Sequence, residues 1–506
     1  MAKLGYSYRR LVNLLGPERV ARGEMERLIH SHDFAAVPKP AYLNFQLVPD
    51  FVVLPKTAEE VVRIVKFANE AEFPIVARGG GTGFYGAGVA NRGGILVDFR
   101  QMRRVAKPDM ATRTISAEAG ATWKQVADAA WNGGAYLPYV PNLAPASTVG
   151  GWINGGGVGI GSYKYGGARE NLLSADLVLP DGSLLRTGSD KLDLGTQFAN
   201  LGPFLFGSEG TLALVTRATL RVYPKPEEVR PLAWTFPSIR QAHEVVSKLV
   251  DSDVVPLHVS LMDENHVLFL QALDGRGPGR RAVLSVALDG PKDENAEDEK
   301  FLDALATAAK GTKVPPAEAK DWWEARFYQY PIRRLANGLV ITEGLVPTYR
   351  LGETVEGVRR LTKKLKLNSA LHLSLVDRGT LLVRPYFLAD ENSITFPTRL
   401  AFIKDFADLC LDLRGHPLGS GLYLAFNLPR MHGVNARKMR YLKRALDPSQ
   451  RFNPGKTVEM WAKLDLPLLG PAKMPPELVR LGLTVAGGLR RILPRDTYTR
   501  GKTEER

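Results

Sequence analysis

A cluster of glycines at residues 79–94 constrains this chain more than any other feature of its sequence. Eight of those sixteen residues are glycine, and they directly follow the apolar residues 74–77 and Arg78. Backbone N–H groups without side chains can close around a phosphate, and only glycine reaches every φ and ψ that such a loop needs. A second glycine-rich loop begins at Thr148, about 70 residues later. Two such loops suit a ligand with a pyrophosphate and two bulky ends.

The first loop also contains a match to the dinucleotide-binding pattern G-x-G-x-x-G, from Gly81 to Gly86. A Rossmann unit needs a helix that begins at the third glycine and an acidic residue about 20 positions further on. Residues 87–94 instead contain three glycines, and Asp98 follows Gly86 after only 12 residues, which is too short for a parallel crossover. We therefore interpret the two loops as a nucleotide cradle of another type, with two purely structural turns as the alternative.

The composition indicates a globular protein with more than one domain. The chain has 506 residues, of which 44% are hydrophobic and 24% are charged. Its single cysteine, Cys410, excludes a disulfide framework and any iron–sulfur cluster ligated by this chain alone. The net charge of +14 is dispersed along the chain, so we expect no nucleic-acid ligand. Because we find neither an apolar N-terminal core nor a run of 18 apolar residues, we expect a cytoplasmic protein.

Two capping boxes predict helices in the first half of the chain. Thr57 with Glu60, and Thr122 with Gln125, have the spacing at which a hydroxyl and a side-chain oxygen satisfy the first N–H groups of a helix. Gly133 suits the left-handed position at the end of the second helix.

Turn residues and apolar periodicity predict the remaining elements. Asp181-Gly182 is a strong hairpin signal, so we predict paired strands at residues 176–180 and 183–187. The other elements follow from alternation or helical spacing. They are strands at 73–77, 211–223, 257–262, 371–375 and 380–387, helices at 240–251 and 439–446, and a solvated charged loop at 290–300.

Six motifs occur in order between residues 51 and 456. They are Arg78-Gly79-Gly80-Gly81-Thr82-Gly83, Thr148-Val149-Gly150-Gly151, Tyr165-Gly166, Val178-Leu179-Pro180-Asp181-Gly182, Gly207-Ser208-Glu209-Gly210-Thr211-Leu212 and Asn453-Pro454-Gly455-Lys456. Together they resemble the vanillyl-alcohol oxidase/p-cresol methylhydroxylase flavoproteins, and within that superfamily the branch of D-lactate dehydrogenases and glycolate oxidase D subunits. The resemblance implies an α+β fold, with a two-part FAD-binding domain of the p-cresol methylhydroxylase type and an α+β cap domain that has a central antiparallel sheet.

The resemblance also divides the chain into five parts. We expect an N-terminal helical segment at 1–46, the FAD-binding domain at 47–224, the cap or substrate domain at 225–438, a return to the flavin at 439–460, and a tail at 461–506 that contains a docking helix.

The cofactor that the resemblance implies is FAD. We expect the FAD to be bound without a covalent link to the protein. No histidine stands beside the first loop, Thr82 is not nucleophilic, and Cys410 lies in an apolar run. By position, the pyrophosphate would be held by Arg78, Gly79, Gly80, Gly81, Thr82 and Gly83. The ring and ribityl chain would be lined by Pro141, Ser147, Thr148, Gly150, Gly151, Asn154, Gly155, Gly156 and Gly157. The adenine side would meet Glu209, Gly210 and Val215, and the C-terminal approach would come from Asn453 and Lys456.

The catalytic motifs of the resembled family are largely missing. His372 matches the first of the family's histidines, the second would fall near Gly379, and Gly419-Ser420-Gly421 stands where Glu-His-Gly is expected, so we expect no metal. Our catalytic candidates are His372, Arg384 and Tyr386. An arginine on an apolar strand needs a partner, and a substrate carboxylate would serve. A structural salt bridge is the alternative for Arg384, and a satisfied core histidine is the alternative for His372.

The resemblance therefore implies an FAD-dependent dehydrogenase that oxidises a D-2-hydroxy acid to the 2-oxo acid. Electrons would pass to a carrier, a quinone or a separate iron–sulfur subunit. Two alternatives stay open, namely a flavin-containing relay subunit of a larger redox complex and a transferase similar to the ether-lipid synthases. For the helix expected at 475–495, three arrangements stay open: docking of a partner, peripheral contact with the inner face of the membrane, and packing on this chain itself.

Overall fold

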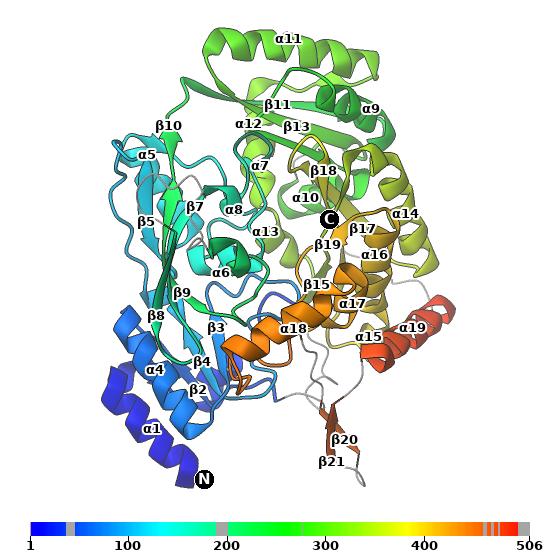
Figure 1. The fold of residues 1–506 in the computed structure, drawn as a ribbon. Helices are drawn as coiled ribbons and strands as arrows, with labels where there is room; N and C mark the ends of the chain where they lie inside the picture. Colours follow the sequence, from blue (N-terminus) through cyan, green and yellow to red (C-terminus); the bar gives the residue numbers. More distant parts are fainter. Residues whose placement is uncertain are drawn as a thin grey trace.

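The computed structural model describes residues 2–36, 46–188, 201–275, 277–458, 463–466, 470–473 and 476–493. They form two bodies that lie side by side, the first in blue and cyan with its last strand, β10, in green, and the second in green to orange in Figure 1. Each body has its own apolar core around its sheets.

The first body contains two four-stranded sheets. In the first sheet β2 and β3 both run parallel to β4, and β1 is antiparallel to β2. Its strands are β1 (Val20–Ala21), β2 (Phe51–Val53), β4 (Ile95–Asp98) and β3 (Ile75–Arg78). The second sheet is antiparallel and consists of β5 (Thr114–Glu118), β9 (Leu214–Arg221), β7 (Leu172–Val178) and β8 (Leu184–Gly188). A small ladder joins β6 (Ala135–Tyr136) to β10 (Tyr223–Pro224).

The first body confirms the predicted strands at 73–77 and 211–223 and the predicted hairpin. Gly182 has φ of +82° between β7 and β8, which is the turn conformation that favours glycine. The helices of this body are α1 (Ala2–Leu15), α2 (Glu24–Ile29), α4 (Ala58–Ala71), α5 (Trp123–Asn132), α6 (Val149–Gly155), α7 (Ser162–Tyr165) and α8 (Ala168–Asn171).

Only part of the predicted capping chemistry forms. Thr57 accepts a bond from the backbone N–H of Glu60 at 3.2 Å, but the Glu60 carboxylate binds the N–H of Lys56 at 2.7 Å instead of returning to Thr57. The box at α5 is complete. The left-handed residue after α5 is Gly134, with φ of +90°, so the prediction for Gly133, whose φ is −85°, was wrong by one position.

The second body is built on a nine-stranded antiparallel sheet. The strand order is β14-β11-β13-β12-β17-β18-β16-β19, and β15 also pairs with β18. The bounds are β11 (Glu228–Phe236), β12 (His258–Met262), β13 (Ala282–Gly290), β14 (Thr312–Lys313), β15 (Gly338–Ile341), β16 (Gly344–Pro347), β17 (Ser369–Leu375), β18 (Thr380–Ala389) and β19 (His416–Pro417). The strands predicted at 371–375 and 380–387 are confirmed, and they pair with each other as β17 and β18.

Helices cover this sheet, and one of them corrects a prediction. They are α9 (Ile239–Val250), α10 (Glu264–Asp274), α11 (Lys292–Ala308), α12 (Pro316–Glu324), α13 (Gln329–Arg333), α14 (Leu351–Lys364), α15 (Phe396–Arg399) and α16 (Ala401–Asp412). The charged loop predicted at 290–300 is the start of α11. Leu302 and Ala306 of α11 are buried, so the charges are the solvent face of a helix, and Asp293 with Glu294 favours its positive N-terminal end.

The C-terminal part of the chain contains α17 (Leu428–His432), α18 (Asn435–Leu446), β20 (Lys463–Leu466), β21 (Gly470–Lys473) and α19 (Pro476–Ile492). The segment that follows α18 returns to the first body, whereas α19 packs on the second. After α18, the backbone N–H of Asn453 donates to Ile75 O in β3 at 2.7 Å. Residues 461–462, 467–469, 474–475 and 494–506 of the expected tail lie outside the described residues. No helix among the described residues has both the length and the hydropathy to cross a membrane.

Candidate functional site

One cavity brings together residues from both bodies and from both glycine-rich loops. Every predicted cofactor-binding residue lines it except Gly156, Asn453 and Lys456. Arg384 also lines the cavity, whereas the two other catalytic candidates, His372 and Tyr386, do not.

The glycines allow the two loops to touch. A Cβ on Gly80 would stand 1.9 Å from the carbonyl oxygen of Ala146, and a Cβ on Gly79 would stand 2.0 Å from the hydroxyl of Thr148. Both distances are far below van der Waals contact, so any side chain would force the loops apart. The sequence has glycine at these positions because one loop is built against the other.

Polar groups of the two loops face the same cavity. The hydroxyls of Thr82 and Ser147 are 3.0 Å apart, and Arg78 donates to His32 O at 2.7 Å.

The cavity wall also contains Asp33, which sequence reasoning missed. Burial raises the pKa of the Asp33 carboxyl. No motif surrounds Asp33, and only the fold brings it to the first loop.

The two C-terminal candidates, Asn453 and Lys456, lie behind the first loop and bind its backbone. Asn453 Nδ2 donates to Glu209 O at 2.6 Å and to Ala87 O at 3.0 Å. Lys456 Nζ donates to Ala87 O at 2.9 Å, to Val89 O, and to Asn453 Oδ1 at 2.6 Å. Burial lowers the pKa of Lys456 to about 7. These contacts fasten the C-terminal return of the chain to the glycine loop.

Arg384 in β18 meets two other residues of the cavity wall. Its Nε donates to Glu343 Oε1 at 2.5 Å, and a terminal nitrogen donates to Asn142 Oδ1 at 2.8 Å. The salt bridge that we kept as the alternative for Arg384 is therefore present. Among the described residues, the buried Nδ2 of Asn142 has no hydrogen-bond partner, so a donor remains at this wall for a cavity ligand.

His372 and Tyr386 lie behind Arg384 in a buried aromatic cluster. His372 pairs with Arg384 in the β17–β18 register, and its Nδ1 is 3.4 Å from a terminal nitrogen of that arginine. The Tyr386 hydroxyl is 2.9 Å from Nδ1 of His266, and the ring of Tyr328 lies 5.0 Å from that of His372. Burial lowers the pKa of His372 and lowers that of His266 to about 3. At neutral pH these histidines are therefore uncharged.

No group of three or more histidine, cysteine, aspartate or glutamate residues in the described part of the chain is arranged to hold a metal ion.

Comparison with known proteins agrees with this geometry. The family described as FAD binding domain matches residues 49–188, and the family of FAD linked oxidases, C-terminal domain, matches residues 225–457. The fold and the cavity define an FAD-linked oxidoreductase, and FAD is its cofactor.

The relatives place the chain within a family. D-lactate dehydrogenase of Archaeoglobus fulgidus is 36% identical over 416 residues, which cover 80% of this chain and 91% of that protein. Glycolate oxidase subunit GlcD of Bacillus subtilis is 28% identical over 469 residues, or 90% of this chain and 96% of that protein. The chain belongs to the family of FAD-linked oxidases that contains these two proteins.

Solved structures share the fold. p-Cresol methylhydroxylase superposes with a TM-score of 0.77 at 17% identity, covering 91% of this chain and 98% of that one. An alkyldihydroxyacetonephosphate synthase superposes with a TM-score of 0.70 at 21% identity, covering 89% of this chain and 84% of that one. The predicted fold, a p-cresol methylhydroxylase type with an antiparallel cap sheet, is confirmed.

Proposed function

We propose that this protein oxidises a D-2-hydroxy acid of the lactate or glycolate type to the 2-oxo acid. The names of the two relatives support this substrate class. The observation that carries the proposal is a buried guanidinium, Arg384, on the wall of the FAD cavity beside Asn142 and Glu343. A 2-hydroxy acid presents a carboxylate that such a group can bind and a hydroxyl that needs a proton acceptor.

The residues that line the cavity fit FAD. The backbone of the first loop and Arg78 would hold the pyrophosphate, and the hydroxyls of Ser147 and Thr148 would bind polar atoms of the cofactor. Bound FAD supplies the acceptor for the hydride that leaves the substrate carbon. Asn453 and Lys456 would not contact FAD directly. They would hold the first loop in the conformation that binds the cofactor.

Three cavity residues would handle the substrate. Arg384 supplies the positive charge for the carboxylate, and Nδ2 of Asn142 adds a donor. Glu343, the cavity carboxylate that contacts Arg384, would accept the proton of the hydroxyl as the C–H bond gives up its hydride. His372 and Tyr386 lie behind Arg384, so we assign them a positioning role.

Electrons must then leave the flavin for another acceptor. Because Cys410 is the single cysteine, this chain cannot ligate an iron–sulfur cluster alone. The Bacillus subtilis relative is named a subunit, which supports an assembly with further proteins. We propose a carrier, a quinone or a separate iron–sulfur subunit as the acceptor.

Anaerobic titration of the flavin absorbance tests this function. D-lactate, glycolate and D-2-hydroxyglutarate are added in turn, with L-lactate as the stereochemical control. At least one D-acid or glycolate should bleach the flavin, and Arg384→Lys should weaken that reduction by about 1.5–3 kcal/mol, the value of a hydrogen bond to a charged group.

A matched control separates catalysis from packing. Arg490 is as buried as Arg384 but lies far from the cavity wall, so Arg490→Lys should leave flavin reduction unchanged. If none of the acids reduces the flavin while a reduced partner protein does, the chain is a relay subunit and the proposal is wrong.

A further inference from the structure

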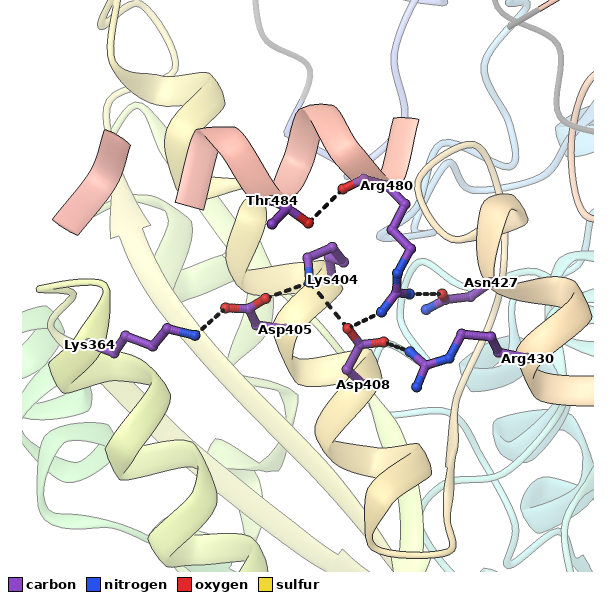
Figure 2. Close-up of polar contacts among 8 residues, drawn as sticks. All are labelled: Lys364, Lys404, Asp405, Asp408, Asn427, Arg430, Arg480 and Thr484. Carbon is purple, nitrogen blue, oxygen red and sulfur yellow. Dashed lines mark hydrogen bonds and ion pairs between the residues drawn. The ribbon is translucent and has the colours of Figure 1, made fainter. Parts of the chain in front are cut away.

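The C-terminal helix α19 is fixed to the second body by specific polar contacts. Figure 2 shows Arg480 of α19 between Asp408 of α16, at 2.7 Å, and Asn427, at 3.0 Å. At the other end of α19, Arg490 is 2% exposed and donates to Leu365 O at 3.1 Å. The red helix at the lower right of Figure 1 is therefore held at both ends.

Between these ends α19 packs closely on α16. A Cβ on Gly487 would stand 3.2 Å from the Cβ of Ala401, which shows how near the two helices approach. Val479 and Leu483 pack against the apolar core of the second body. One face of the helix is therefore buried on this chain, which is one of the three arrangements that the sequence left open.

The opposite face of α19 carries a second apolar stripe that nothing in the described structure covers. Its members recur at helical spacing, three or four residues apart. This outer stripe consists of Leu478 (51% exposed), Leu481 (57%), Val485 (55%), Leu489 (50%) and Ile492 (77%). Gly482 and Gly488 are exposed beside it and add no side chain, so the stripe can lie flat against a surface.

Basic residues gather at the C-terminal end of this stripe. Arg491 is exposed, and so is Lys363 in the last turn of α14. Lys366, two residues after α14, donates to Leu493 O at 3.0 Å, which fixes the end of α14 beside the end of α19. The only acidic residue of α19 is Glu477, at its opposite end, and the whole chain has a net charge of +14.

We propose that the outer stripe of α19 rests on an anionic lipid surface. An aliphatic stripe with basic residues beside it is the pattern of a helix that lies in the membrane interface, where apolar side chains enter the acyl boundary and cations meet lipid phosphates. A protein partner is less well matched, because protein interfaces are enriched in aromatic residues and methionine, and the stripe contains only leucine, valine and isoleucine. The helix would hold the FAD protein at the membrane surface without crossing it.

Flotation of the purified full-length holoprotein with vesicles tests the proposal. The vesicles are of phosphatidylcholine, with or without phosphatidylglycerol, and the protein should float only with the second kind. Leu481→Gln combined with Leu489→Gln should weaken this binding by about tenfold or more, since half-exposed leucines would no longer enter the lipid. FAD content and thermal stability should not change, because both side chains point away from the core.

Two control pairs match these changes. Leu184→Gln with Phe204→Gln alters two side chains that are each 58% exposed elsewhere, and it should leave flotation unchanged. Lys363→Gln with Arg491→Gln should weaken binding to the anionic vesicles by about thirtyfold, which corresponds to about 2 kcal/mol for two basic residues near the surface. Arg103→Gln with Lys107→Gln removes the same charge at a distant exposed loop and should have little effect.

Failure of the wild-type protein to float with anionic vesicles would overturn the proposal. So would equal loss of flotation in the stripe variant and in the Leu184/Phe204 control. If the stripe variant instead abolished a concentration-dependent dimer in light scattering while vesicle binding stayed absent, the stripe would belong to an interface between two copies of the chain.

Discussion

Removing either member of the Arg384–Glu343 pair should destabilise the protein by about 2–3 kcal/mol, and removing both together should cost much less than the sum of the two losses. The Arg384 side chain is 2% exposed, and that of Glu343 is 15% exposed. Breaking a buried ion pair by removing one partner costs about 3–5 kcal/mol, because the other charge stays buried without compensation. Replacing both partners with apolar residues of similar volume is often close to neutral. The test set is Arg384→Met, Glu343→Leu and the double variant.

The contacts that remain in each variant reduce its loss to the lower end of this range or below it. Without Glu343, the guanidinium keeps Asn142 at 2.8 Å and Ser374 at 3.3 Å as neutral acceptors. Glu343→Leu should therefore cost about 3 kcal/mol, the lower end of the range. Without Arg384, water reaches part of the Glu343 carboxylate, so Arg384→Met should cost about 2 kcal/mol. The double variant should lose only about 1–2 kcal/mol, which gives a coupling energy of about 3–4 kcal/mol.

Thermal unfolding measures these differences. For a cooperative unit of about 150–250 residues, 1 kcal/mol shifts Tm by about 2–4 °C, so Glu343→Leu should lower Tm by about 6–12 °C. The exposed pair Lys124–Asp128, at 2.7 Å, is the control, and its cycle should give a coupling below about 0.5 kcal/mol. If the losses of the two single variants at the buried pair simply add in the double variant, the pair is not coupled and the reasoning is wrong.

Three further outcomes are expected. Gly80→Ala places a Cβ 1.9 Å from Ala146 O and should yield protein with little bound FAD by absorbance, whereas Gly83→Ala, whose Cβ meets nothing closer than 3.5 Å, should keep its flavin. Acid precipitation should release free FAD into the supernatant, because the thiol of Cys410 is buried, and a yellow pellet would contradict this. Burial raises the pKa of Asp263 from 3.8 to about 7, so its contribution to stability is complete below pH 3.8 and is lost as the pH rises through 7. Asp263→Asn should flatten this decline in urea unfolding measured between pH 4 and pH 8, and an unchanged slope would refute the assignment.

The part of the cavity that the two glycine-rich loops form could be predicted because its information is local. Gly79 and Gly80 are needed because the two loops touch at these positions. Such a run of adjacent glycines can be recognised in the sequence without knowledge of the fold. The part of the cavity around Arg384 depends on pairs that are distant in the sequence. Arg384 meets Glu343 across 41 residues and Asn142 across 242, and no local pattern encodes those distances. One weak signal existed, because Glu343 is a lone carboxylate between the apolar strands β15 and β16.

The errors in the fold have the same origin. The capping box at Thr57 has only one of its two hydrogen bonds, the one from the Glu60 N–H to the Thr57 hydroxyl. The Glu60 carboxylate is bound at 2.7 Å by Arg19, which comes from another part of the chain and competes for it. We predicted a loop at 290–300 because that segment is rich in charged residues. The apolar side chains that anchor α11, Leu302 and Ala306, come only after it. In the first case a tertiary partner decided the outcome, and in the second the deciding apolar residues of the same helix lay beyond the charged segment.

The cavity also explains why the chain must return to its first body. Arg78 and Gly80 of the lining come from the first body, and Glu343 and Arg384 come from the second, so neither body alone makes the site. Lys456 ties the C-terminal return of the chain to the first body, because its Nζ donates to the backbone oxygen of Ala87 in the first loop. A ligand that bridges both walls stabilises the assembled state over any state in which the bodies separate, in proportion to its affinity. Bound FAD that meets both walls would therefore also help to hold the two bodies together.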